Sequence, residues 1–251
     1  WNTPNGLSFV VILFLNTKSH SNPEEVALAI GVIVLCGIPS VSAKIPTVSS
    51  VYVLHFDKIS AHAAAKAVLF FEERQIKGNF IASDIFKLKR LEHKFDLIIC
   101  HDVIEHIKDK ATFLSNLPKY INSEGIIFMS FPAWQMPFGG HQQICKSKII
   151  SHFPFIHLLP APIYKGILKF GGESTGCIEE LLSIKETKTS IELFEKLVHE
   201  KHITIIDRQL FFINPHYEIK FRLKPRRLYA IIAGIPYLRN FFTTSCFYTL
   251  K

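Results

Sequence analysis

Ionisable side chains follow directly after a short apolar segment near the middle of the chain. Leu97–Cys100 consists of four apolar residues, which is typical of a strand buried on both faces. The polar residues that come next are His101, Asp102, Glu105 and His106. In an open α/β sheet, ligands bind outside the carboxyl ends of the strands. This segment therefore predicts a ligand-binding site.

The same residues allow a metal hypothesis, because Asp102, Glu105 and His106 form a D-x-x-E-H pattern. On a helical turn, positions i, i+3 and i+4 share a face, so all three side chains could reach one ion. Two carboxylates with one imidazole suit magnesium or manganese more than zinc. Capping and packing roles explain the pattern more simply, and we expect no metal at this site.

A second candidate group follows a later apolar segment, Ile126–Ser130. It is Gly139-Gly140-His141, preceded by a loop that contains Trp134, Met136 and Phe138. A histidine has a pKa near neutrality and can take a proton from a hydroxyl group. His141 is therefore the candidate catalytic base. The alternative is that His141 holds the glycine loop through hydrogen bonds.

Alternating strands and helices are needed to position these groups. The hydrophobic pattern predicts strands at Val26–Cys36, Val51–Phe56, Asn79–Ala82, Phe95–Cys100 and Ile126–Ser130. It predicts helices at Ser60–Gln75, Asp109–Leu117 and Ser190–His199, and a late antiparallel strand pair at Ile203–Asn214 and Phe241–Leu250. The expected α/β fold is a Rossmann-like, seven-stranded, mostly parallel sheet with helices on both faces.

The segment FDLIICHDVIEHI, residues 95–107, closely resembles the fourth strand of class I S-adenosylmethionine (SAM)-dependent methyltransferases. The chain from about Val26 onward can be laid on that family's order of elements. The resemblance implies methyl transfer from SAM to a small-molecule or lipid-linked acceptor, most often at oxygen. The D-x-x-E-H pattern is also similar to the metal-binding residues of some ubiquinone-pathway O-methyltransferases.

The resemblance also assigns cofactor-binding residues. Cys36 and Gly37 match the centre of the family's glycine-rich turn, although Leu35 and Pro39 stand where glycines are expected. The carboxylate of Asp57 would accept hydrogen bonds from the ribose hydroxyls, and His55 is an alternative at this position.

Two further segments complete the expected cofactor site. Ser83, Asp84 and Ile85 would hold the adenine ring, and the Asp84 carboxylate would accept a hydrogen bond from the adenine amino group. The backbone of Cys100, His101 and Asp102 would line the methionine end.

The expected domain organisation follows from the same resemblance. Residues 1–25 remain an unassigned N-terminal segment, and residues 26–251 form one methyltransferase-like domain. Residues 131–200 interrupt the strand–helix rhythm with prolines and aromatic residues, and are expected to form an insertion that covers the substrate side. Leu35 and Pro39 stand where the family has glycines, and this favours an alternative in which the fold is kept as a non-catalytic partner- or lipid-binding module.

Composition and charge restrict the partners. The chain has 251 residues, of which 48% are hydrophobic, so it can bury a sizeable core. Its net charge of +8 favours anionic partners, including acidic lipid surfaces, and leaves peripheral membrane contact open. The basic residues are dispersed and accompany no nucleic-acid-binding motif, so we expect no nucleic-acid partner.

Cysteine usage and the N-terminal apolar runs bear on the compartment. Five widely spaced cysteines without a C-x-x-C pair argue against a disulfide framework and a zinc site, which suits the cytoplasm. Val26–Ala43 is eighteen residues without a charge, but glycines and a proline interrupt it. A buried strand and loop is the favoured interpretation of that segment, and a membrane anchor is the weaker alternative.

Overall fold

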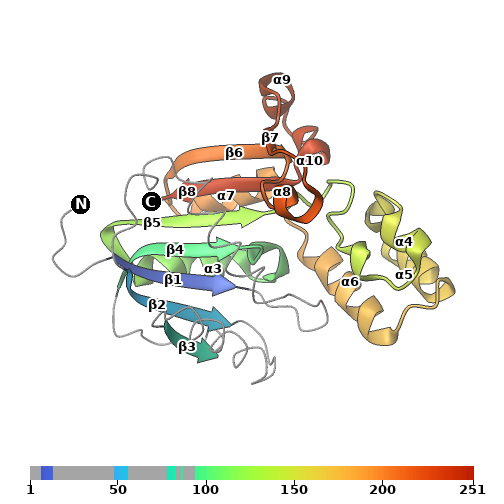
Figure 1. Cartoon of the computed structure of the whole chain (residues 1–251), viewed down its shortest axis with the longest axis horizontal. Helices are drawn as coiled ribbons and strands as arrows, with labels where there is room; N and C mark the ends of the chain where they lie inside the picture. The colour runs from blue at the N-terminus through green and yellow to red at the C-terminus, as the bar shows by residue number, and fades with distance from the viewer. Residues whose placement is uncertain (1–6, 14–47, 56–77, 83–85, 87–93) are drawn as a thin grey trace.

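The computed structural model describes residues 7–13, 48–55, 78–82, 86 and 94–251. Its centre is one mixed sheet in which eight described strands follow the order β3-β2-β1-β4-β5-β8-β6-β7 (Figure 1). The strands are β1 Leu7–Leu13, β2 Val48–His55, β3 Gly78–Ala82, β4 Phe95–His101, β5 Ile121–Phe131, β6 Ile205–Ile213, β7 Arg226–Arg227 and β8 Ser245–Leu250. Neighbours from β3 to β5 pair in parallel, whereas β8, β6 and β7 add antiparallel pairs.

The mixed sheet with helices confirms the predicted fold class in outline. The predicted count of seven strands is not met, because the described part of the chain contributes eight, including the two-residue β7. The late antiparallel pair is confirmed: β6 and β8 pair from Ile205 opposite Leu250 to Phe211 opposite Ser245. The predicted helix Ser60–Gln75 lies outside the described residues.

The prediction for the first strand was wrong. The place between β2 and β4 is taken by β1, which lies inside the segment 1–25 that the sequence analysis left unassigned. The predicted strand Val26–Cys36 lies outside the described residues. Both segments are apolar, and hydrophobicity alone does not determine which of two such runs pairs with a given strand.

The strand predicted at Ile126–Ser130 begins earlier, because residues 121–125 also belong to β5. Ile121 pairs with Phe95 and Ile126 pairs with Leu97, so the extra residues between them bulge out of the register. Gly125 permits this bulge, because a Cβ atom there would lie 2.4 Å from Cγ1 of Ile121 and 2.9 Å from the Phe95 carbonyl oxygen.

Two helices cover one face of the sheet. They are α3, Lys110–Asn116, and α7, Ile191–Glu200, which contact each other and share an apolar core with β4, β5 and β8. Asp109 caps α3 by accepting a hydrogen bond from the Thr112 amide, and Ser190 caps α7 in the same way. Both helices confirm the sequence predictions to within a residue or two.

A separate helical region extends beyond the carboxyl ends of the parallel strands (Figure 1). It contains α4, Lys148–His152, α5, Ala161–Phe170, and α6, Thr175–Thr187. These helices enclose a second apolar core that includes Tyr164, Leu168 and Leu181. We call residues 142–187 the helical region. Among the described residues, no helix has the length and apolar character needed to cross a bilayer.

Three short helices complete the structure between β6 and β8. They are α8, His216–Phe221, α9, Ala230–Ala233, and α10, Arg239–Phe242. Arg239 fixes this segment to α7, because its guanidinium group donates to Glu192 at 2.9 Å and to Glu195 at 2.8 Å. As a result, α8 is held near the carboxyl end of β4 and β5, where the helical region begins (Figure 1).

Candidate active site

The strand order reverses direction at β1, which lies between β2 and β4. Leu13 at the end of β1 pairs with His101 at the end of β4, so the carboxyl ends of these strands lie side by side. A reversal of strand order in a parallel sheet opens a crevice at this edge, and ligands bind there. The structure therefore places His101 and Asp102 at the edge that the sequence predicted.

His101 and Asp102 form an ion pair. Nδ1 of His101 lies 3.2 Å from Oδ2 of Asp102, and the side chains are 12% and 46% exposed. Burial would lower the pKa of His101, but the charge and hydrogen bond of Asp102 outweigh burial and raise it. Burial would likewise raise the pKa of Asp102, and the His101 ring instead lowers it. Each group therefore stabilises the charged form of the other.

Asp102 also turns the chain at the end of β4. Its φ is +51°, a left-handed conformation that aspartate tolerates better than most residues, and its amide donates to the Ser130 carbonyl oxygen at 2.9 Å. The helical turn that the D-x-x-E-H hypothesis assumes is one 3₁₀ turn, Ile104–His106. Asp102 lies outside this turn, so its carboxylate does not share a helical face with Glu105 and His106 as the D-x-x-E-H hypothesis required.

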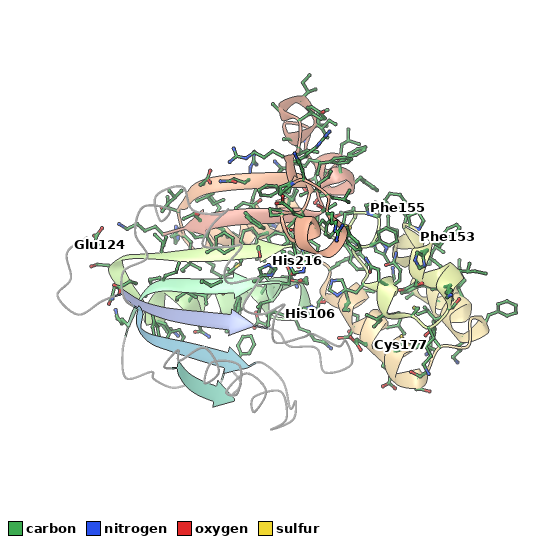
Figure 2. All side chains as sticks on the ribbon, viewed as in Figure 1. His106, Glu124, Phe153, Phe155, Cys177 and His216 are labelled. Atoms are coloured by element: carbon green, nitrogen blue, oxygen red, sulfur yellow. The ribbon has the colours of Figure 1, made fainter. Side chains whose placement is uncertain are left out.

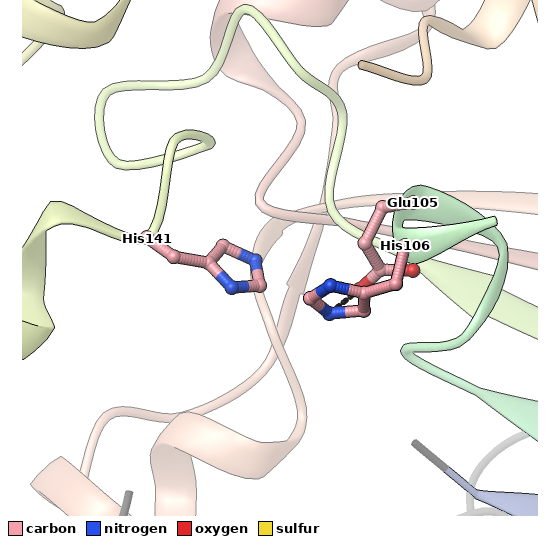
Figure 3. A group of neighbouring side chains, drawn as sticks. All are labelled: Glu105, His106 and His141. Carbon is pink, nitrogen blue, oxygen red and sulfur yellow. Dashed lines mark ion pairs between the residues drawn. The ribbon is translucent and has the colours of Figure 1, made fainter. Parts of the chain in front are cut away.

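A different residue completes the group of potential ligands. Glu105, His106 and His141 each offer a side-chain ligand atom, and these atoms all lie within 4.8 Å of one another (Figure 3). We call these three residues the sheet-edge cluster. Nε2 of His106 lies 3.9 Å from Oε1 of Glu105, and the two imidazole rings meet edge to face with centroids 5.2 Å apart.

Burial decides the protonation of the sheet-edge cluster. Glu105 is 4% exposed, and its pKa is raised well above the usual range by burial and by the charge of Asp102. Burial and the neighbouring His141 lower the pKa of His106 to about 3. Burial also lowers the pKa of His141, against a smaller opposing effect of Asp102. At neutral pH the two imidazoles are therefore uncharged, and His141 can accept a proton.

The loop that carries His141 is fixed by close contacts. A Cβ atom on Gly139 would lie 2.2 Å from the Trp134 carbonyl oxygen, and one on Gly140 would lie 2.2 Å from Cβ of His157. His157 is fully buried, and its Nε2 lies 2.8 Å from the same Trp134 oxygen. Only glycine permits this approach of the two segments. The glycine pair thus positions His141, which itself has a φ of +58°.

Sequence reasoning missed the residues that hold the 3₁₀ turn. The Thr187 hydroxyl, at the end of α6, donates to the Glu105 carbonyl oxygen. The ammonium group of Lys110 donates to the carbonyl oxygens of Ile107 and Thr187, and burial lowers its pKa to about 8. The partners are far apart in the sequence, so no local pattern links Thr187 to the end of β4.

Tyr217 in α8 is a further residue near the site, and it belongs to no motif that the sequence analysis describes. Burial raises the pKa of its hydroxyl, and the charge of Asp102 adds to this effect. Tyr217 is half-buried, so part of its side chain is exposed to solvent. The helix α8 therefore brings Tyr217 within electrostatic reach of Asp102.

The remaining predicted cofactor residues fall into two groups. The side chain of Cys100 is buried in the sheet core, so only its backbone can face a ligand. The others lie outside the described residues, namely Cys36, Gly37, Asp57, Ser83, Asp84 and Ile85. The described strands β2 and β3 end at His55 and Ala82, each two residues before a predicted aspartate.

Comparisons with known proteins agree with this architecture. Residues 59–160 match a family model described as a methyltransferase domain. A solved SAM-dependent methyltransferase from Clostridium acetobutylicum is 12% identical, with a TM-score of 0.50, 99% of this chain covered and 86% of that chain. A plantazolicin methyltransferase solved with S-adenosylhomocysteine is 13% identical, with a TM-score of 0.50, 97% of this chain covered and 76% of that chain.

The family match over residues 59–160 and the fold shared with these solved structures agree with the predicted resemblance to class I SAM-dependent methyltransferases. Among curated proteins, the ubiquinone biosynthesis O-methyltransferase of Rickettsia bellii is 36% identical over 64 residues. Those residues are 26% of this chain and 26% of that protein, so the match spans about a quarter of the length of the relative. The non-catalytic alternative gains no support from these matches.

Proposed function

We propose that this chain transfers the methyl group of SAM to an oxygen of a small-molecule or lipid-linked acceptor. The observation that carries the proposal is the position of the His141 imidazole beside Glu105 and His106 at the carboxyl end of β4, within the segment that matches the methyltransferase domain. The similarity to a ubiquinone biosynthesis O-methyltransferase favours oxygen as the methylated atom.

His141 is the proposed general base. The acceptor hydroxyl oxygen forms a bond to the methyl carbon while the bond from that carbon to sulfur breaks, and the hydroxyl proton passes to His141. Burial keeps the His141 pKa low, so the lone pair that receives the proton is free at neutral pH. The close packing of Gly140 on His157 fixes the imidazole, which matters because in-line transfer depends on alignment.

The cofactor residues proposed from the resemblance belong to this same edge. The backbone from Cys100 to Asp102 would line the methionine end, and Asp84 with Ser83 and Ile85 would hold the adenine ring. Asp57 would bind the ribose, and Cys36 with Gly37 would form the turn beside the methionine. SAM supplies an electrophilic methyl group on a sulfonium ion.

The sheet-edge cluster also fits a divalent cation. It presents two imidazoles and one carboxylate, and both Glu105 oxygens lack hydrogen-bond partners on other described residues. Glu105, His106 and His141 would hold such an ion, which would occupy the His141 lone pair and would supply Lewis-acid chemistry in place of the base. We favour the metal-free base, because burial raises the pKa of Glu105 and so disfavours the carboxylate form that a metal ion needs.

The exposed apolar side chains of the helical region favour a lipid-linked acceptor or contact with a membrane surface. Phe170, Ile149 and Phe153 are 96%, 80% and 58% exposed, and Figure 2 labels Phe153. The exposed Lys165 and Lys169 lie on the same helix as Phe170. Apolar groups beside cationic ones are typical of a surface that contacts anionic lipid.

The test is a methyl-transfer assay with isotopically labelled SAM and a panel of phenols, alcohols, amines and polyprenyl-linked phenols. We expect label in a hydroxyl-bearing acceptor and none in matched methyl ethers that lack a free hydroxyl. Transfer to amines alone would contradict O-methylation. Absence of any transfer by a folded chain that binds SAM would restrict the conclusion to cofactor binding.

A further inference from the structure

A second cluster of potential ligands lies in the helical region, away from the sheet edge. Cys145, Glu173 and Cys177 each offer one ligand atom, and these atoms lie within 4.8 Å of one another. We call these residues the thiol cluster. Cys145 follows the 3₁₀ turn Gln142–Ile144, Glu173 precedes α6, and Cys177 lies in the first turn of α6, where Figure 2 labels it.

Glu173 is a buried carboxylate without a cationic partner. It is 8% exposed, and its two oxygens accept hydrogen bonds from the amides of Lys146 and Ser147 at 3.1 and 2.9 Å. Among the described residues, no Lys, Arg or His forms an ion pair with it. A buried charge is normally paired or coordinates a metal. The two amides orient this carboxylate toward the thiols without neutralising it.

Two free thiols complete the cluster. Cys145 is 8% exposed and Cys177 is half-buried, and the two side chains are hydrogen-bonded to each other. They come from different elements, so the packing of α6 against the segment before α4 brings them together. A pair of thiols beside a carboxylate is a donor set that selects a soft divalent metal.

Tyr164 supplies an independent observation. It is fully buried in the apolar core that contains Cys145, and its hydroxyl has no hydrogen-bond partner among the described residues. A buried tyrosine hydroxyl normally finds a partner. The charges of Cys145 and Cys177 both act on this hydroxyl, which puts it within electrostatic reach of the two sulfurs.

We propose that Cys145, Cys177 and Glu173 bind one Zn²⁺ ion, with a water molecule or the Tyr164 hydroxyl completing the tetrahedral coordination. Zinc lies about 2.3 Å from sulfur and about 2.0–2.2 Å from oxygen, so its ligand atoms are roughly 3.5–3.8 Å apart, which small movements of the present cluster reach. Binding releases the two thiol protons. The ion would coordinate Glu173 directly and join the starts of α4 and α6.

This site is independent of methyl transfer. It lies in the second apolar core, and none of its residues belongs to the sheet-edge cluster. Its role is structural, because the ion would tie together the helical region that covers the substrate side. The competing occupant of the same geometry is a disulfide between Cys145 and Cys177.

Titration of the reduced, metal-free full chain with Co²⁺ tests the proposal. Co²⁺ replaces Zn²⁺ in tetrahedral sites and gives a thiolate charge-transfer absorption, which ligands of the sheet-edge cluster cannot produce. We expect that absorption to saturate at one Co²⁺ per chain and to disappear on addition of Zn²⁺. Cys145→Ser and Cys177→Ser should each lose it, and Glu173→Gln should weaken binding.

Two controls keep the experiment decisive. Cys246→Ala removes a thiol of the sheet core, and His141→Ala removes a ligand of the sheet-edge cluster, so both should keep the absorption. Circular dichroism shows whether each variant is folded. A folded, reduced wild-type chain without thiolate absorption would overturn the proposal. So would mass spectrometry that finds Cys145 and Cys177 joined as a disulfide in the chain as purified, together with no Co²⁺ binding after reduction.

Discussion

The sheet-edge cluster and the thiol cluster are built in different ways. Glu105 and His106 are neighbours in the sequence, and the end of β4 presents both at the edge where ligands bind. Cys145 and Cys177 meet only because two helical segments pack against each other. The first kind of site follows from strand topology, whereas the second depends on tertiary packing. The first is therefore assigned to chemistry and the second to stability.

The largest expected effect separates the two clusters by activity. His141→Ala should lower kcat by about 10²–10⁴, because it removes the proposed base, while SAM binding is kept. Cys177→Ala should leave kcat near the wild-type value. The measurement is steady-state methyl transfer at saturating SAM. If both variants lose activity equally, the assignment of catalysis to the sheet-edge cluster and of stability to the thiol cluster is contradicted.

The next effect concerns the pH dependence of stability. The pKa of His106 falls from about 6.5 in the unfolded chain to about 3 in the folded chain. Protons therefore bind the unfolded chain preferentially as pH falls below about 6.5. The unfolding free energy should decrease by up to about 1.4 kcal/mol per pH unit down to about pH 3.

Urea unfolding at a series of pH values measures this slope. His106→Asn should flatten it relative to the wild type, because asparagine does not bind a proton in this range. His199→Asn, which changes an exposed histidine of α7, should leave the slope as it is. Equal slopes for all three chains would show that His106 is not buried as an uncharged ring.

A pair of glycine substitutions compares the loop of the sheet-edge cluster with the helical region. Gly140→Ala should destabilise the chain by about 1–3 kcal/mol, because its Cβ would overlap His157. Gly166→Ala should stabilise it by about 0.5–1 kcal/mol, because nothing lies within 4 Å of the new Cβ and alanine favours the interior of α5. Urea midpoints measure both, and a tolerated Gly140→Ala would contradict the positioning of His141.

The smallest effect addresses the exposed side of the helical region. Phe170→Ser should weaken binding to vesicles of anionic phospholipid by roughly tenfold, because burying a phenylalanine side chain contributes about 1.5–3 kcal/mol. Phe221→Ser, which changes an exposed phenylalanine of α8, should have no effect. Cosedimentation measures both. Equal binding by the two variants would show that Phe170 does not contact the membrane surface.

Much of the fold was predictable where the hydrophobic pattern is local. The buried run of β4, the caps of α3 and α7, and the apolar runs of β6 and β8 all predict their elements from neighbouring residues. The first strand was predicted at Val26–Cys36, whereas β1 is Leu7–Leu13. Two apolar runs compete for one place in the sheet, and the pairing that decides between them is non-local.

The site was predictable to a similar extent. Glu105, His106 and His141 were candidates from the sequence, because they follow strands at the carboxyl edge. The metal hypothesis placed Asp102 in one group with Glu105 and His106, whereas the left-handed conformation of Asp102 puts it outside the 3₁₀ turn that carries the other two. Long-range partners such as Thr187 carry no local signal. The cysteine spacing predicted no zinc site, and it does not reveal that Cys145 and Cys177 lie close together, because their proximity depends on helix packing.

Calorimetric titration of the full chain with SAM and S-adenosylhomocysteine tests the central claim most directly. We predict binding in the micromolar range that Asp84→Ala weakens and His141→Ala preserves, because the first residue is proposed to hold adenine and the second to act on the acceptor. Absence of binding by a folded wild-type chain, or binding that Asp84→Ala leaves unchanged while His141→Ala abolishes it, would contradict this account.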